Sequence, residues 1–278
     1  MDIVTLIVSV VMGLLAPVGF VVDTLAEEAL RGQIAGAEEL YLRIDNVPNY
    51  QLLNGRIDHA RIAARGLYFL QLPDLRIDAI DLETDVVDVD FAALQGGELK
   101  LDEPVQVALR LQLKASDLNA FLASPLVQGW LDTLRITLPG ATGERERNRY
   151  GLANPTLEFL AGDRFRLTVD LVDRVLGDTA AIEIDIGLGI VNGSRFELID
   201  PKIEIDGEPA PPQLITSLTE GASQEFTLKR LEEFGLIARV LAFDVRDNEL
   251  DLAVFARLEP DSPFLRVAPA DEAALPTP

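Results

Sequence analysis

The stretch LRIDAIDLETDVVDVDF, residues 75–91, decides the fold of this 278-residue chain. Apolar and polar residues alternate along it, as in a β-strand with one buried and one solvated face. The alternation changes phase between Ala79 and Ile80 and again between Val86 and Val87. Because a strand cannot exchange its faces without turning its side chains over, each change predicts a β-bulge. Unbroken, the stretch would reach ~55 Å, against ~17–20 Å for a usual strand. Long, bulged strands of this kind predict a strongly curled sheet.

Similar alternation on both sides of this stretch predicts a largely antiparallel sheet. The pairs Asn54-Gly55 and Asn192-Gly193 are strong hairpin signals between such strands. The first pair is followed by a strand toward Leu70. The other predicted strands cover residues 39–45, 105–113, 165–171, 182–190, 196–198, 236–246 and 250–258.

Two long amphipathic helices bracket the predicted sheet. Apolar residues recur at helical spacing over residues 22–34, and Gly36 is a natural stop. The same spacing returns over residues 214–234, where Gly235 is the stop. We therefore expect one amphipathic helix near each end of the chain, with its apolar side packed on the apolar face of the sheet.

Two short helices complete the prediction: Ser116 caps one through Leu122, and Ser124-Pro125 opens one through Leu134. The fold class is α+β, with a long, bulged, strongly curled antiparallel sheet wrapped around the two amphipathic helices. An ordinary sandwich core would share the alternation, but strand length and bulging favour a curled sheet that leaves an elongated apolar groove. The residues expected to line this groove are Leu25, Leu30, Ile34, Leu109, Leu111, Leu214 and Leu218.

Residues 3–22 carry no charge and, at ~1.5 Å rise per residue, cover ~30 Å, the thickness of a bilayer core. An uncleaved membrane helix, a cleavable signal peptide and a helix buried in the fold all fit this length. A signal peptide wants a basic start, whereas the chain begins Met1-Asp2. The expected organisation is a membrane helix or signal anchor over 1–22, a single domain over 23–260 and a loose Pro- and Ala-rich tail over 261–278.

The net charge of −22 argues against a nucleic-acid partner, because phosphate contacts need clustered Lys and Arg. It also disfavours electrostatic docking on anionic lipid, so membrane association must come from apolar surface or from the leader. One irregular segment is basic, and it is either an exposed loop or a binding segment for anionic lipid head groups. Its arginines are Arg145, Arg147 and Arg149.

Few residues have the chemistry of a catalytic or metal site. The chain has no cysteine and one histidine, His59, which the pattern places on the polar edge of a hairpin. Asp85, Asp88 and Asp90 follow a strand pattern and lack the glycine turn and closing glutamate of a calcium loop. No phosphate loop, nucleophile elbow or zinc-protease motif is present, and no spacing indicates a carboxylate-pair hydrolase. We therefore predict no cofactor, no metal and no catalytic residue.

Five segments carry a resemblance to a known family: VPNYQLLNGR (47–56), RIAARGL (61–67), LKASDLN (113–119), Ser124-Pro125 and LEEFGLIAR (231–239). They resemble the LmeA-type phospholipid-binding family, over a span from about Leu25 to Pro260. The resemblance implies a fold like that of tubular lipid-binding (TULIP) domains, with a phospholipid in the groove, and a place in the cell envelope. None of the segments is a catalytic signature, and the chain departs from the family by lacking a basic start.

Two functions remain open at this point. The first is non-enzymatic phospholipid binding or carriage at the cell envelope, with acyl chains in the apolar groove. The second is a membrane-anchored structural or scaffold domain whose core is full, and the presence of a cavity discriminates between them. Arg31 and Arg43 follow the apolar segment and favour a cytoplasmic domain by the positive-inside rule. The family resemblance favours the extracytoplasmic side, which we adopt as the prediction.

Overall fold

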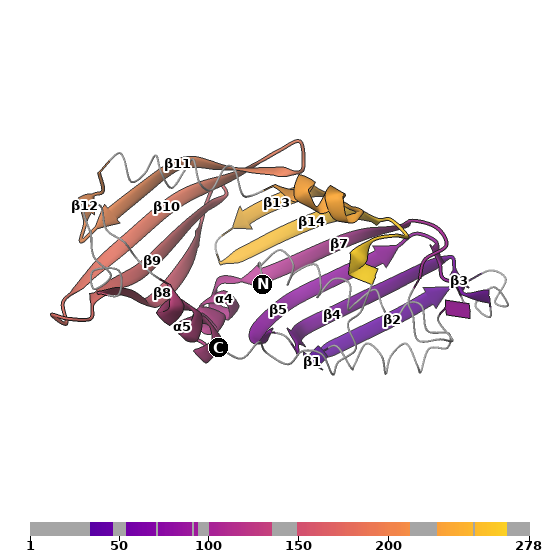
Figure 1. Ribbon diagram of the computed structural model, residues 1–278, viewed down its shortest axis with the longest axis horizontal. Coiled ribbons are helices and arrows are strands. Elements are labelled where there is room, and N and C mark those ends of the chain that lie inside the picture. The colour runs from indigo at the N-terminus through magenta and orange to yellow at the C-terminus, as the bar shows by residue number, and fades with distance from the viewer. Residues whose placement is uncertain are drawn as a thin grey trace.

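Two antiparallel sheets lie end to end along the molecule, with helices between them (Figure 1). The computed structural model describes residues 34–46, 54–70, 72–90, 92–93, 100–134, 149–211, 227–246 and 248–265. Strand pairing is antiparallel throughout the described ladders, and helices accompany the sheets. The predicted α+β class, dominated by antiparallel sheet, is confirmed.

The larger sheet buries most of the core. Its seven strands are β1 (Ile34–Gly36), β2 (Glu39–Asp45), β4 (His59–Phe69), β5 (Leu72–Thr84), β7 (Val105–Lys114), β13 (Leu236–Arg246) and β14 (Glu249–Leu258). Their order is β1-β4-β5-β7-β14-β13, with β2 also paired to β4. The buried face is densest on β4 and β5, where Ile62, Leu67 and Leu82 are almost fully covered. Alternation of this kind is what the sequence predicted for these strands.

The smaller sheet is a meander of hairpins. Its five strands are β8 (Tyr150–Leu160), β9 (Arg164–Asp173), β10 (Thr179–Val191), β11 (Arg195–Ile205) and β12 (Glu208–Pro209), in the order β12-β11-β10-β9-β8. The predicted Asn192-Gly193 turn joins β10 to β11, with φ of 53° and 66° at the two residues. Strand β8 was not predicted, because Asn154 (φ 50°) and the ladder shift beside it interrupt the alternation.

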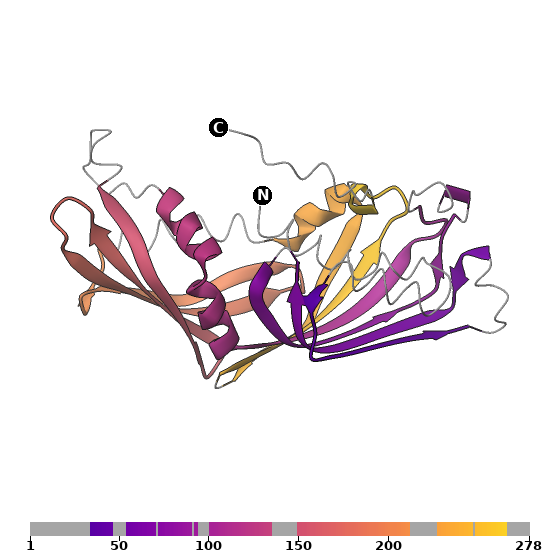
Figure 2. The same ribbon diagram turned by 90° about the horizontal axis from the view of Figure 1, so that it is seen from below.

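Helix α4 (Ala115–Leu122) ties the two sheets together (Figures 1 and 2). From β5 of the larger sheet, Arg76 Nη1 donates a hydrogen bond to Asp117 Oδ2 on α4 at 2.8 Å. On the other side, the Asn119 amide group bonds both backbone groups of Leu157 in β8, at 2.8 Å and 2.7 Å. Because one short helix is bonded to a strand of each sheet, it fixes how the sheets meet.

The short helices are where they were predicted, but one cap is different. Helix α5 (Pro125–Thr133) begins after Ser124, whose Oγ accepts a hydrogen bond from Val127 N at 3.4 Å. For α4 the capping residue is Lys114, which makes no side-chain cap bond. The prediction of Ser116 as the cap is wrong, because the strand runs directly into the helix and Ala115 N donates to Asn248 O instead.

The two long helices are corrected where the structure describes them. Ile34, predicted on the first helix, lies in strand β1 and pairs with Phe69. Thr227 is extended and caps a separate 3-10 helix, η3 (Leu228–Phe234), so residues 214–234 are not one continuous helix. Gly235 does end this segment, with φ of 71°. The rest of both predicted helices lies outside the described residues, and the last described element is η4 (Pro263–Leu265).

The first phase change in the apolar alternation of residues 75–91 occurs without a β-bulge. Ala79 and Ile80 are neighbours on opposite faces of β5, yet they are 3% and 2% exposed. The β4–β5 ladder keeps its register here and passes from the pair Arg65–Ala79 to the pair Leu67–Ile77 across Gly66, whose φ is 57°. Both strands therefore turn their buried faces over at the same point. The bulge predicted at Ala79–Ile80 is wrong for that reason.

The second phase change, at Val86–Val87, lies just beyond the end of β5. β5 stops at Thr84, the chain bends at Asp85, and β6 (Val87–Asp88) pairs with β3 (Arg56–Ile57) in a separate two-stranded sheet. A change of sheet thus replaces the bulge predicted at Val86–Val87. Among the described residues neither main sheet closes on itself, so the strong curl expected from this stretch is not confirmed (Figure 2).

Candidate functional site

The larger sheet carries a half-buried apolar surface on β7 and β14. Leu109, Leu111 and Leu113 alternate along β7, and the ladder places them opposite Val254, Leu252 and Leu250. All six side chains are of intermediate exposure, unlike the covered core on β4 and β5. This half of the apolar face is therefore only partly covered, although Leu109, Leu111 and Leu113 also pack against the core.

The smaller sheet presents an apolar face of the same kind. Its ladders put Leu167 beside Ile184 and Phe165 beside Ile186, on one side of the sheet. The half-buried apolar residues on this face are Phe165, Leu167, Ile182, Ile184, Ile186, Leu188, Ile190, Phe196 and Leu198. A few neighbours, such as Val169 and Ile203, are buried.

Aromatic contacts join these two faces into one. The Phe165 ring lies 5.5 Å from the Phe159 ring, edge to face, and 6.1 Å from the Phe243 ring of β13. These rings pack in a small cluster with Val245 and Leu250 of the larger sheet. We call the joined surface the apolar strip: Leu109, Leu111, Leu113, Leu250, Leu252 and Val254, then Phe243, then the nine half-buried residues of the smaller sheet given above.

The opposite faces of both sheets are charged. Arg110 Nε donates to Asp251 Oδ1 at 3.0 Å between β7 and β14, and this bond lowers the pKa of the Asp251 carboxyl below its usual value. On the smaller sheet Arg164 Nε donates to Asp185 Oδ1 at 2.8 Å. Ion pairs on one side and half-covered hydrocarbon on the other give the molecule a distinct binding side, since contiguous exposed apolar surface marks interaction sites.

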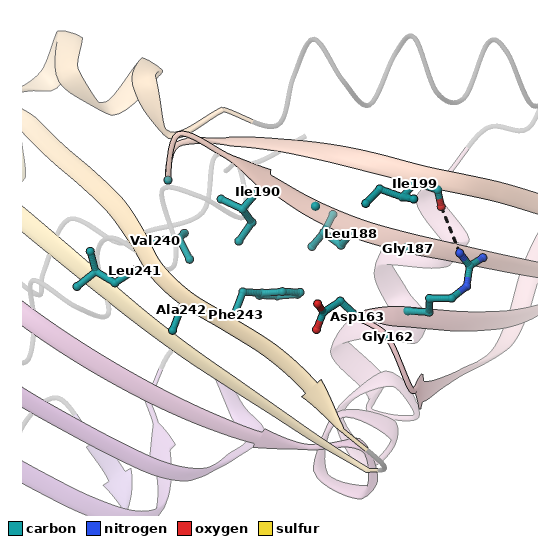
Figure 3. A pocket seen from close by; sticks show the side chains of 13 residues that line it. Gly162, Asp163, Gly187, Leu188, Ile190, Ile199, Val240, Leu241, Ala242 and Phe243 are labelled. Atoms are coloured by element: carbon teal, nitrogen blue, oxygen red, sulfur yellow. Dashed lines mark hydrogen bonds between the residues drawn. The ribbon is translucent and has the colours of Figure 1, made fainter.

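A cavity of about 370 Å³ opens where the two sheets meet (Figure 3). We call it the junction slit. Figure 3 shows Leu188 and Ile190 pointing from β10 toward the Phe243 ring, while Leu241 points away from it. The cavity is lined by Gly162, Asp163, Arg164, Gly187, Leu188, Gly189, Ile190, Gly193, Ile199, Val240, Leu241, Ala242 and Phe243. Its inner side is thus continuous with the apolar strip.

Hydrogen bonds close the junction slit at both ends. Val240 N donates to Gly193 O at 2.7 Å, and Val245 N donates to Asp163 Oδ1 at 2.9 Å. Asp163 also holds β10, because its carbonyl accepts from Leu188 N at 2.9 Å. Between the two attachments, the edge of β13 and the smaller sheet flank the cavity.

The one guanidinium in the cavity lining is engaged with protein groups. Arg164 Nη2 donates to Asp200 O at 3.2 Å and Nη1 to Ile199 O at 3.5 Å, besides the bond to Asp185. These carbonyls belong to a register shift in the β10–β11 ladder, where β11 carries an extra residue. Arg164 therefore satisfies the bulge, and the other lining residues, apart from Asp163, are apolar or glycine.

The groove residues predicted from sequence are partly brought together. Leu109 and Leu111 lie on the apolar strip, as described above. Ile34 does not: it is buried in the core at the β1 edge of the larger sheet. Leu25, Leu30, Leu214 and Leu218 lie outside the described residues. The lipid-binding role of all these residues stays a prediction.

Of the three predicted head-group arginines, only Arg149 lies in the described residues, and it is separated from the strip. Arg149 precedes β8 at the end far from the slit, and its Nε donates to Asp173 Oδ2 at 2.7 Å. This bond, with backbone donors at Val175 and Leu176, lowers the pKa of Asp173 to about 2. The Arg149 guanidinium also lies 5.2 Å from the Tyr150 ring. Arg145 and Arg147 lie outside the described residues.

Sequence reasoning missed the aromatic junction and the glycines of the slit. The alternation places Phe165 on a strand face, but nothing local in the sequence indicates that it meets Phe243. Gly187 and Gly189 did carry a signal, because glycine inside an otherwise branched strand marks a close approach or an opening. A Cβ at Gly189 would lie 2.9 Å from Ile199 Cδ1, so the side chain of Ile199 uses that space.

Other site chemistries find little support among the described residues. No group of three or more potential metal ligands occurs in that part of the chain. His59 begins β4 opposite Asp45 and accepts a hydrogen bond on Nε2 from Arg61 Nε at 2.9 Å. Within the same residues, no helix combines the length and apolarity needed to cross a bilayer, and the predicted segment 1–22 lies outside them.

Comparison with known proteins gives one match. The model of a family described as LmeA-like phospholipid-binding matches residues 16–255. No curated protein and no solved structure matches the chain.

Proposed function

This chain belongs to the LmeA-like phospholipid-binding family, and from that premise we propose that it holds phospholipid acyl chains along the apolar strip. The observation that carries the proposal is the half-buried state of the strip across both sheets. Large apolar side chains left half covered on a continuous face retain free energy that a bound acyl chain can release, at ~0.8 kcal/mol per buried CH₂.

The proposed role is binding or carriage without chemical conversion. The strip offers hydrocarbon side chains, which hold acyl chains but supply no acid, base or nucleophile. The ion pairs that could supply such groups, Arg110–Asp251 and Arg164–Asp185, lie on the opposite face of the sheets. The carboxylate in the cavity beside the strip, Asp163, accepts a hydrogen bond on Oδ1 from Val245 N and so holds β13 to the smaller sheet.

The proposed setting is the cell envelope. In this proposal residues 1–22 keep the protein at a membrane, residues 23–260 form the lipid-binding domain on the extracytoplasmic side, and residues 261–278 are a tail. The length and apolarity of the first segment support the anchor. The head-group role of Arg145, Arg147 and Arg149 remains a prediction from the sequence.

A scaffold with a filled core is the alternative, and the packing of β4 and β5 favours it. Ile62, Leu67 and Leu82 are at most 2% exposed in that part of the larger sheet. The two functions differ in what the strip does: it stays empty of lipid in a scaffold and is occupied in a carrier.

Native mass spectrometry of the purified full chain tests the proposal. We expect a species heavier than the chain by the mass of a phospholipid. Leu167→Arg should lower that occupancy by about tenfold or more, because it puts a charge among acyl chains. Thr168→Arg is the matched control, since Thr168 is the next residue on the opposite face and pairs with Glu183. Unliganded parent protein, or equal occupancy in both variants, would overturn the proposal.

A further inference from the structure

Residues from both faces of the smaller sheet line the junction slit. Leu188 and Ile190 belong to the apolar strip, so Gly187 and Gly189, their neighbours along β10, lie on the opposite side. Ile199 pairs with Gly187 in the ladder and lies on that side too. Since all five residues line one cavity, the cavity borders both the strip and the outer face.

Backbone features keep this cavity open. The β13–β14 register shifts between Val240 and Ala242, so Leu241 is an extra residue that pushes the edge of β13 outward. The hydrogen bonds at Val240 and Val245 stand five residues apart, which spans ~16 Å of strand. On the facing strand, Gly187 and Gly189 have no side chains, and the Ile199 side chain lies over both of them.

The outer mouth of the slit is apolar on a charged face. Leu241 is 67% exposed and Ile199 is 47% exposed, and both line the cavity. Their surroundings on the outer face include the Arg164–Asp185 ion pair. In a chain of net charge −22, an exposed apolar pair at a cavity mouth fits contact with lipid hydrocarbon rather than with an anionic surface.

We propose that the junction slit is the passage through which a phospholipid acyl chain moves between a bilayer and the apolar strip, with Leu241 and Ile199 contacting the lipid at the outer mouth. This inference rests on the proposed function, because a passage is needed only if the strip holds lipid. The occupant is an acyl chain because the lining side chains other than Asp163 and Arg164 are apolar or glycine, and because the slit borders Leu188, Ile190 and Phe243 of the strip. Asp163 and Arg164 are themselves held by hydrogen bonds to protein groups.

A passage governs the rate of lipid exchange rather than the amount of lipid held at equilibrium. The uptake of a phospholipid with a fluorescent acyl chain from phosphatidylcholine vesicles measures the rate, and native mass spectrometry measures the occupancy. Leu241→Glu puts a charge at the mouth and Ala242→Phe fills it. We expect each to slow uptake about tenfold or more, which corresponds to ~1.4 kcal/mol in the barrier, with parental occupancy after long incubation.

Control variants carry the same changes on an equally exposed apolar surface elsewhere. Leu176→Glu and Val175→Phe lie in the β9–β10 turn, where the two residues are 65% and 73% exposed. They should exchange lipid at the parental rate. Far-ultraviolet circular dichroism, which measures the strand content, reports whether every variant is folded.

The remaining outcomes separate the two proposals. A parent protein that never acquires lipid defeats the proposed function. A lipid-loaded parent whose slit variants exchange at the parental rate defeats the passage, as does a loss of occupancy with an unchanged rate. A Leu241→Glu variant that changes from dimer to monomer in sedimentation, with no change in exchange rate, shows instead that a second copy covers the mouth.

Discussion

In the larger sheet, the core-facing apolar side chains of β4 and β5 are almost completely buried, whereas in the smaller sheet those of β9 and β10 are mostly half-buried. Leu82 of β5 is 1% exposed, while Leu167 and Ile184 are only partly covered. The two regions share the same alternation of apolar and polar residues. The difference teaches that alternation defines a face, and that the packing onto this face decides whether it becomes a core or a binding surface.

The boundary between the two regimes runs through the larger sheet itself. Ile80 and Leu82 of β5 belong to the core, but their ladder partners Leu111 and Leu109 on β7 are half buried. The apolar side chains of β7 that face this part of β5 are therefore less buried than their partners. The apolar strip thus begins at β7, well before the second sheet, and continues across the Phe165–Phe243 contact.

The largest loss of stability is expected for a substitution in the buried core on β5. Leu82→Ala should reduce the free energy of unfolding by ~2–5 kcal/mol, because it leaves a cavity in a close-packed core. Urea denaturation of the full chain measures the loss, and bound-lipid mass should be unchanged in molecules that remain folded. A cost below ~1 kcal/mol would mean that β5 is no better packed than the smaller sheet.

A smaller effect is expected one strand away, on the strip. Leu109→Ala should cost less than the ~2 kcal/mol at the lower end for core leucines, since its surroundings are already partly open. Leu109→Trp should be tolerated in stability yet lower lipid occupancy, whereas overpacking a filled core costs ~1–3 kcal/mol. Denaturation and native mass spectrometry on both variants distinguish the cases. A strongly destabilised tryptophan variant of a lipid-free parent favours the scaffold.

The smallest effect is expected from the polar anchor at the far end of the smaller sheet. Arg149 and the backbone donors hold the pKa of Asp173 at about 2, below the usual 3.8. A lowered pKa means that the native state favours the carboxylate, so this contribution is present above pH ~4 and disappears as the pH falls toward ~2. Asp173→Asn should therefore lower Tm at pH 6 and converge with the parent at the acid end. Parallel Tm curves over that range would contradict this assignment.

Local sequence signals were reliable where the governing interaction is local. The alternation of β7 and β10, the Asn192-Gly193 turn, the Ser124 cap and the Gly235 stop are all present. Each depends on backbone preference or on a contact within a few residues. The errors have the opposite character: the helix start at Ala115 and the strand at Ile34 depend on partners at Asn248 and Phe69.

The sequence by itself determined most of the antiparallel strands, the Asn192-Gly193 turn, the charged and apolar faces, and a family described as phospholipid-binding. Asn54-Gly55 lies instead in the long connection between the paired strands β2 and β4. The tertiary structure alone decided that both β4 and β5 turn over at Gly66, that the two apolar faces join at Phe165 and Phe243, and that a slit separates β13 from the smaller sheet. The physical reason is separation along the chain. Asp163, Gly193, Val240 and Val245 meet at the slit although they are far apart in sequence, and only packing of the whole chain sets how closely such segments approach.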